Sequence, residues 1–307
     1  MSQASQTDRN AGKQELLDPQ FVRQLDRLDV LSRKILTGKL QGERRSKRKG
    51  QSVEFADYRN YVAGDDLRFI DWNLYARLDK LFLRLFMEEQ DLSVAVAVDV
   101  SKSMDWGDPN KLDYARRVAA ALGYIGLTHY NRVSIFSFAD TIVDQMINMR
   151  GRRPIPQMLD FLSGQVGQGG GDLSAVCRRL ALTLRGKGVV IILSDFLDKS
   201  DVNAALRYLA GDLHDVYLLQ LLAPQEMDPS KGGIVGDLRL QDIEDHSFAE
   251  VSVSRALINR YKENLHNHCD ELRRICLKRN MIYMQAETSV PFDTLVLQYL
   301  RQRGLVG

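Results

Sequence analysis

The 307-residue sequence has few cysteines, no long apolar run and almost no net charge. Its three cysteines, Cys177, Cys269 and Cys276, are odd in number and lack CxxC spacing, which argues against a disulfide framework. No stretch approaches the roughly 20 apolar residues of a membrane span, and the polar first residues lack the apolar segment of a signal peptide. A net charge of +2 does not suit a protein that coats nucleic acid. We therefore expect a cytoplasmic protein without an integral membrane segment.

One apolar run ends in a group of oxygen-bearing side chains. Residues 94–98 are all valine or alanine, a pattern typical of a parallel strand that is buried on both faces. Asp99, Ser101 and Ser103 follow this run directly. Open α/β sheets bind ligands at the carboxyl ends of their strands, and carboxylate and hydroxyl oxygens suit Mg²⁺ or Mn²⁺. The run therefore predicts a metal site.

A second apolar run supplies a candidate second carboxylate. Residues 189–193 read as another buried strand, and Asp195 follows it. Both groups also have a purely structural interpretation. The serines after the first strand and the aspartate after the second can each cap the helix that follows.

Strand and helix patterns alternate from residue 93 to residue 223, which is typical of a mostly parallel sheet with helices on both faces. We predict that the chain has three parts. Residues 1–15 are a disordered tail, and residues 16–88 form a segment with a helix over 18–37 and short strands. Residues 89–307 form an α/β domain with a hairpin at 236–253.

The segment before the α/β domain interleaves charges of both signs. Asp65, Asp66 and Asp71 resemble a catalytic acidic cluster, but neighbouring arginines favour ion pairs with a structural role. The residues that stand out in this block are Glu54, Arg59, Gly64, Asp65, Asp66, Arg68, Asp71, Trp72 and Arg77.

A basic run precedes this block and consists of Arg44, Arg45, Lys47, Arg48 and Lys49. Such a run can contact nucleic acid or anionic lipid through phosphates. No aromatic side chains alternate with it, and no nucleic-acid-binding fold is recognisable in the pattern. We therefore favour a solvated loop or an acidic protein partner, with nucleic-acid binding as the alternative.

Two sets of motifs resemble known families. The Asp-x-Ser-x-Ser string at 99–103, the glycine-rich loop at 164–172 and Ser194-Asp195 resemble the von Willebrand factor A domain and its metal-ion-dependent adhesion site. The string Gly-Asp-Asp-x-Arg-x-Ile-Asp-Trp at 64–72 is similar to the signature of the domain of unknown function 58 family. The resemblance implies a three-layer α/β fold, to which the short strands predicted before the α/β domain add a small β-rich amino-terminal appendage. It also implies a bacterial, non-enzymatic adaptor that works with a MoxR-type AAA+ ATPase in chaperone-like assembly or stress response.

The sequence departs from the adhesion site at one ligand position. In that site a threonine of the glycine-rich loop is the third hydroxyl ligand, and here Gly171 stands in its place, followed by Asp172. Water or Asp172 would fill the gap, or the site is weakened. In the family pattern, Asp195 reaches the metal through water, and a carboxylate of a partner protein completes the octahedron.

An enzymatic alternative uses the same carboxylates. Asp99 and Asp195 would hold Mg²⁺ for phosphoryl transfer or hydrolysis. Haloacid-dehalogenase-like phosphatases need a second aspartate two residues after the first, where this chain has Ser101. The predicted site lacks a paired nucleophile and base, so the residues favour binding over turnover.

Overall fold

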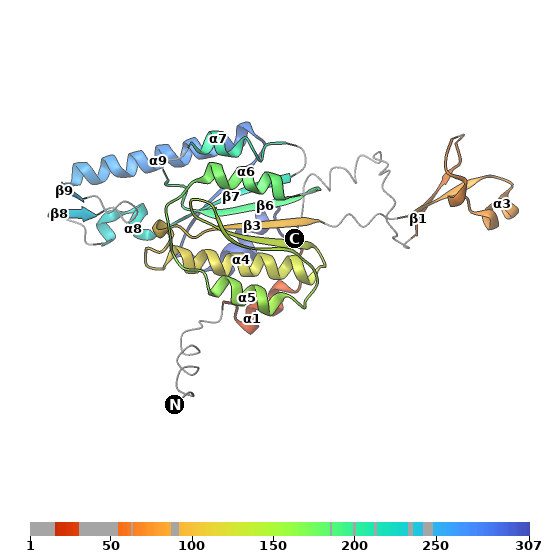
Figure 1. The fold of residues 1–307 in the computed structure, drawn as a ribbon, viewed down its shortest axis with the longest axis horizontal. Coiled ribbons are helices and arrows are strands. Elements are labelled where there is room, and N and C mark those ends of the chain that lie inside the picture. The colour runs from red at the N-terminus through yellow and green to blue at the C-terminus, as the bar shows by residue number, and fades with distance from the viewer. Residues whose placement is uncertain are drawn as a thin grey trace, which may run out of the picture. The chain divides into compact units, whose positions relative to one another are not determined.

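The computed structural model describes residues 16–30, 55–62, 64–86, 92–184, 186–198, 201–211, 214–232, 236–241 and 248–307. The predicted tail at 1–15, the basic run at 44–49 and Glu54 lie outside the described residues. The chain divides into two compact units, a larger one of residues 1–41 and 92–307 and a smaller one of residues 42–91 (Figure 1). The sequence placed residues 16–30 with the smaller part, whereas the structure assigns them to the larger unit.

A six-stranded sheet forms the centre of the larger unit, with the order β10-β7-β6-β3-β4-β5. Five strands run parallel, and the edge strand β5 is antiparallel to β4. The strands are β3 (Ser93–Asp99), β4 (Arg132–Phe138), β5 (Ile142–Met149), β6 (Gly188–Ser194), β7 (His214–Leu222) and β10 (Ile282–Glu287).

Helices cover both faces of this sheet (Figure 1). Because side chains alternate along a strand, β3 sends Val94, Val96 and Val98 into the core formed with α4 and α5. The smaller Ala95 and Ala97 face the core formed with α6, α7 and α9. The helices are α1 (Pro19–Leu25), α4 (Lys111–Thr128), α5 (Ile155–Ser163), α6 (Leu173–Thr183), α7 (Val202–Leu206) and α9 (Arg255–Lys278). The predicted three-layer α/β architecture is confirmed.

The helix predicted over residues 18–37 ends earlier within the described residues, and residues 31–37 lie outside them. α1 begins after the cap Asp18 and ends at Leu25. Backbone hydrogen bonds then join Asp29 to Gly307 in both directions, and Val30 forms a bridge with Val306. Pairing with the carboxyl-terminal end therefore overrides the helical spacing of the sequence.

Short elements complete the larger unit. α8 (Pro224–Met227) follows β7, and α10 (Phe292–Thr294) leads into a π-helical turn over Leu295–Leu300. The predicted hairpin is confirmed as the antiparallel pair β8 (Gly236–Gln241) and β9 (Phe248–Val253). Among the described residues, no helix combines the length and the apolar character that crossing a membrane requires.

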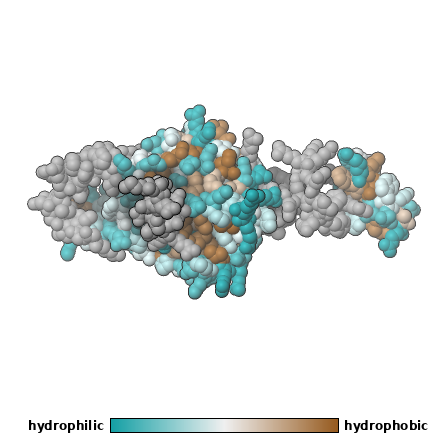
Figure 2. Space-filling view, turned by 60° about the horizontal axis from the view of Figure 1, so that its bottom comes forward, coloured by the Kyte–Doolittle hydropathy of each residue, from teal (hydrophilic) through white to brown (hydrophobic). Residues whose placement is uncertain are grey.

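The smaller unit is built on a second antiparallel pair, β1 (Phe55–Asn60) and β2 (Phe82–Phe86), with α3 (Trp72–Leu78) between them in the sequence. A two-stranded sheet offers little area for a core. Of its described side chains, Ile70 and Leu83 are buried apolar ones. Figure 2 shows apolar side chains at the surface of this unit, and Trp72, at 61% exposure, is the most exposed of its large ones.

Candidate functional site

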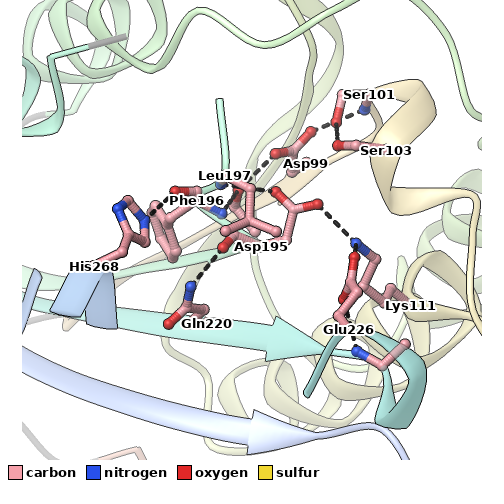
Figure 3. Close-up of polar contacts among 12 residues, drawn as sticks. Asp99, Ser101, Ser103, Lys111, Asp195, Phe196, Leu197, Gln220, Glu226 and His268 are labelled. Carbon is pink, nitrogen blue, oxygen red and sulfur yellow. Dashed lines mark hydrogen bonds and ion pairs between the residues drawn. The ribbon is translucent and has the colours of Figure 1, made fainter. Parts of the chain in front are cut away.

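The two predicted carboxylates come together because β3 and β6 are neighbouring parallel strands. Val98 is paired with Leu193, so the next residues, Asp99 and Ser194, leave the sheet side by side. The hydroxyl of Ser194 donates a hydrogen bond of 2.6 Å to Oδ2 of Asp99 (Figure 3). Asp195 follows in the chain and is 2% exposed. The sequence analysis named Ser194 beside Asp195 but did not predict its hydrogen bond to Asp99.

Ser101 and Ser103 lie beside the carboxylate of Asp99 in the loop after β3 (Figure 3). The backbone N–H of Ser101 donates to Oδ1 of Asp99 at 2.8 Å. The two serine hydroxyl oxygens are 3.0 Å apart, and a 3₁₀ turn over Lys102–Met104 holds them there. One carboxylate and two hydroxyls thus meet at the strand end, as predicted from their spacing.

A buried lysine, which sequence reasoning missed, neutralises Asp195. Lys111 begins α4 and is fully buried, with its Nζ 2.8 Å from Oδ2 of Asp195 and 2.5 Å from Oε1 of Glu226 on α8 (Figure 3). A cation at a helix amino terminus is electrostatically unfavourable unless carboxylates compensate it. The position of Lys111 in the first turn of an apolar helix signals that it needs carboxylate partners, but it does not identify them.

The backbone around Asp195 is held from the opposite side. Its carbonyl accepts a 2.7 Å hydrogen bond from the side-chain amide of Gln220 on β7. The ring Nε2 of His268 on α9 lies 2.8 Å from the carbonyl of Phe196. These contacts fix the direction in which the Asp195 side chain leaves the sheet. His268 thus has a structural role in holding this backbone.

The charges of the site are strongly coupled. Burial and the negative charge of Asp195 raise the pKa of Asp99 to about 7. Burial lowers the pKa of Lys111, but the charges of Asp195 and Glu226 outweigh it, so the net pKa is raised. Burial is also the main cause of the raised pKa of Glu226. Lys111 therefore stays protonated, and Asp99 is the carboxylate for which a further cation would be favourable.

The oxygen set fits a small divalent cation. Adjacent ligands of octahedral Mg²⁺ lie roughly 3 Å apart, because each Mg–O bond is about 2.1 Å. The 3.0 Å between the hydroxyl oxygens of Ser101 and Ser103 matches this spacing. In the part of the chain that the structure describes, no three or more His, Cys, Asp or Glu residues group as metal ligands. A cation here would rest on the two serine hydroxyls and Asp99, with Asp195 behind them.

The glycine-rich loop lies beside the serines, as the resemblance implied. The carbonyl of Gly169 accepts a hydrogen bond from the N–H of Lys102 at 3.3 Å. The carboxylate of Asp172 is engaged elsewhere. Its Oδ1 caps α6 and accepts a hydrogen bond from the N–H of Ala175 at 3.0 Å. A Cβ added to Gly171 would lie 3.2 Å from Cβ of Asp198, which is tight but close to ordinary contact. A Cβ at position 171 therefore fits only if the side chain of Asp198 shifts by a few tenths of an ångström.

The signature residues of the smaller unit form local polar contacts. Arg59 pairs with Asp65 at 2.8 Å and Arg68 with Asp66 at 2.6 Å. Asp71 is buried, caps α3 through the N–H groups of residues 73 and 74, and accepts a 3.0 Å hydrogen bond from the hydroxyl of Tyr58. Gly64, at φ +103°, makes a turn that side chains disfavour. These contacts give the aspartates the structural role expected from the interleaved arginines.

The three cysteines are buried free thiols. Burial raises the pKa of Cys177 and of Cys276 to about 12, so these thiols are protonated at neutral pH. These three residues form no disulfide, in agreement with their odd number and spacing.

A family model described as "Protein of unknown function DUF58" matches residues 57–271. The chain belongs to the DUF58 family. The match spans both units, from β1 of the smaller one to α9 of the larger one. The family predicted from the Gly64–Trp72 string and the strand-end motif is confirmed.

Curated relatives of this DUF58 protein come from mycobacteria. The uncharacterized protein Rv1480 of Mycobacterium tuberculosis is 29% identical over 245 residues, covering 78% of this chain and 76% of the relative. The uncharacterized protein Mb1516 of Mycobacterium bovis matches with the same identity and coverage.

Solved structures with a similar fold share little sequence with this DUF58 protein. An aerotolerance-related membrane protein of Bacteroides fragilis is 14% identical with a TM-score of 0.41, covering 69% of this chain and 99% of that one. The von Willebrand factor type A protein of Catenulispora acidiphila is 13% identical with a TM-score of 0.42, covering 73% and 43%. The hypothetical protein BatB of Bacteroides thetaiotaomicron is 13% identical with a TM-score of 0.39, covering 69% and 98%.

Proposed function

We propose that this DUF58 protein is a non-enzymatic interaction module that binds Mg²⁺ or Mn²⁺ at Asp99, Ser101 and Ser103. The bound cation would receive a carboxylate from a partner protein and so bridge the two. The observation that carries the proposal is the meeting of one carboxylate and two hydroxyls at the end of β3, with the hydroxyl oxygens 3.0 Å apart.

The electrostatics of the site support cation binding. Asp99 is 4% exposed, and burial beside the charge of Asp195 disfavours its ionised form. A divalent cation relieves this cost, because it compensates the carboxylate at short range in a region of low dielectric. Lys111 already compensates Asp195. The additional cation would therefore compensate the negative charge of Asp99.

The family and the fold support binding rather than turnover. The fixed carboxylates and hydroxyls can orient a cation, whereas the ammonium of Lys111 is engaged by Asp195 and Glu226 and is not available for proton transfer.

Within this proposal the partner is a MoxR-type AAA+ ATPase, with the cytoplasm as the shared compartment. The support for this partner is the family resemblance of the 64–72 string.

Isothermal titration calorimetry tests the metal. The wild-type protein is titrated with Mg²⁺ and with Mn²⁺ beside Asp99→Ala and the control Asp160→Ala, which removes an exposed aspartate on α5. We expect saturable binding for the wild type and the control and its loss in Asp99→Ala. Unchanged binding in Asp99→Ala, or none in the folded wild type, would contradict the metal site.

A pull-down tests the partner separately. The purified chain is immobilised and offered the MoxR-type ATPase of its own organism with Mg²⁺ or with EDTA. Retention that depends on Mg²⁺ and on Asp99 supports the bridge. Retention that EDTA and Asp99→Ala leave unchanged would support the partner and reject the role of the metal.

A further inference from the structure

The central sheet has an open edge at β10. This strand pairs in parallel with β7 from Ile282 opposite Tyr217 to Glu287 opposite Leu222. In the part of the chain that the structure describes, no strand pairs with its other side. Open edges present unpaired N–H and C=O groups and are ready sites for adding another strand.

The residues that face this edge follow from the backbone pattern. The N–H of Thr288 donates to the carbonyl of Leu222 on β7 at 2.9 Å. In a parallel strand the N–H and C=O of one residue point to one side, and those of the next residue point to the other. Counting back from Thr288, the backbone groups of Tyr283, Gln285 and Glu287 point away from β7.

A groove of about 620 Å³ runs along this edge. Residues 281–285 and 287 line it, with Leu277 on α9 forming part of one side. Leu277 is 70% exposed, an unusual state for a leucine beside a groove. Met227, Met281 and Met284 also line the groove, and of these Met281 and Met284 are buried in the core. The edge therefore offers backbone hydrogen-bonding groups together with a mixture of apolar and polar side chains.

The two ends of the edge carry opposite charges. Arg273 of α9 pairs with Asp270 of the same helix at 2.8 Å, and its guanidinium lies 5.7 Å from the ring centre of Tyr283. Glu287, four residues further along β10, carries the negative charge and also lines the groove. A strand of this kind is complementary to a copy of itself in the antiparallel direction, because each positive end then meets a negative end.

We infer that β10 is the interface of a twofold homodimer, in which the β10 strands of two copies pair antiparallel and join two six-stranded sheets. In the register that we infer, Gln285 of one copy lies opposite Gln285 of the other, and the two backbones exchange hydrogen bonds. Each Tyr283 then lies opposite Glu287 of the second copy. The second copy's Glu287 carboxylate then lies beside Arg273, twice per dimer. The same pairing covers the exposed Leu277. Twofold, self-complementary contacts of this type are the commonest in homo-oligomers.

This inference is independent of the metal site, which lies at the ends of β3 and β6. Its test is the oligomeric state of the full chain by sedimentation equilibrium in the presence of EDTA. The variants are Glu287→Lys, Arg273→Glu and the double variant. The control is Glu271→Lys, which makes the same charge change on the opposite side of α9, because two residues along a helix point about 200° apart. Circular dichroism confirms that each variant is folded.

We expect a dimer for the wild type and the control. Each single charge reversal places like charges together and should raise the dimer Kd by about tenfold or more. The double variant restores opposite charges across the twofold axis and should return the Kd towards that of the wild type. A wild type that stays monomeric up to about 100 µM, well above the range of stable dimers, would overturn the inference. So would single reversals that leave the Kd unchanged, or a double variant no better than the singles.

Discussion

The ammonium of Lys111 lies 2.8 Å from the carboxylate of Asp195, and both side chains are buried at the candidate metal edge. The same ammonium contacts Glu226, so one buried cation joins the start of α4, the end of β6 and α8. A charge network of this kind sets the geometry of the site and also its response to mutation and pH.

Lys111→Met should destabilise the fold, because it leaves two buried carboxylates without their cation. Breaking a buried ion pair from one side typically costs about 3–5 kcal/mol in the free energy of unfolding. Chemical denaturation with EDTA measures this, and Lys278→Met, a change at an exposed position of α9, is the control. If the proposed metal binds nearby, saturating Mg²⁺ should restore part of the loss. A variant as stable as the wild type would show that the triad is not a structural unit.

Cation binding should strengthen with pH up to neutrality. Burial and Asp195 raise the pKa of Asp99 to about 7, so a proton competes with the cation below that pH. The apparent affinity for Mn²⁺ should fall by up to about tenfold for each pH unit below this value and level off above it. Calorimetric titrations between pH 5.5 and 8.5 measure the profile. An affinity independent of pH would mean that Asp99 is not the ligand that ionises.

The same shift predicts how stability depends on pH without metal. Asp99 has a raised pKa in the folded state and one of about 3.9 when unfolded, so the folded state binds more protons between these values. The free energy of unfolding contributed by this group is therefore largest at low pH and falls as pH rises towards 7. Asp99→Asn should remove this component, which urea denaturation at several pH values in EDTA would reveal.

Ser194→Ala should weaken both the fold and the site. Its hydroxyl donates to Asp99 at 2.6 Å and accepts from the N–H of Phe196 at 2.9 Å. Losing a buried hydrogen bond to a charged group costs about 1.5–3 kcal/mol, and the cost should be larger at pH 8, where Asp99 is ionised, than at pH 5. Ser137→Ala is a matched control on β4. This serine is also buried, but the structure gives its hydroxyl no hydrogen-bond partner among the described residues, so its loss should be nearly neutral.

The candidate site was predictable only where its residues are neighbours in the sequence or follow buried strands. Asp99, Ser101 and Ser103 lie within five positions, and Asp195 follows an apolar run, so parallel pairing alone brings them to one edge. Lys111 and Glu226 are 115 positions apart, and no local pattern links them. The contact exists because α4 and α8 happen to meet beside β6, which is a property of tertiary packing.

The fold shows the same division between local and distant determinants. The valine-alanine run of β3 predicts a strand that is buried on both faces, and the structure confirms it. The end of α1 at Leu25 depends on Gly307, almost the whole chain away, whose backbone pairs with Asp29. The helical spacing of residues 26–30 could not reveal that backbone pairing with Gly307 competes with the helix.

Gly171→Thr should increase the affinity for Mg²⁺, because it restores the hydroxyl that the glycine-rich loop lacks. The added Cβ would lie 3.2 Å from Cβ and 3.4 Å from Oδ2 of Asp198, so a shift of a few tenths of an ångström in that side chain accommodates it. Gly171→Ala is the matched control, since it adds the same Cβ without a hydroxyl. Calorimetry should show tighter binding for the threonine variant than for the alanine variant. Equal affinities in the two would mean that the loop supplies no ligand at this position and that the cation is held from the β3 side alone.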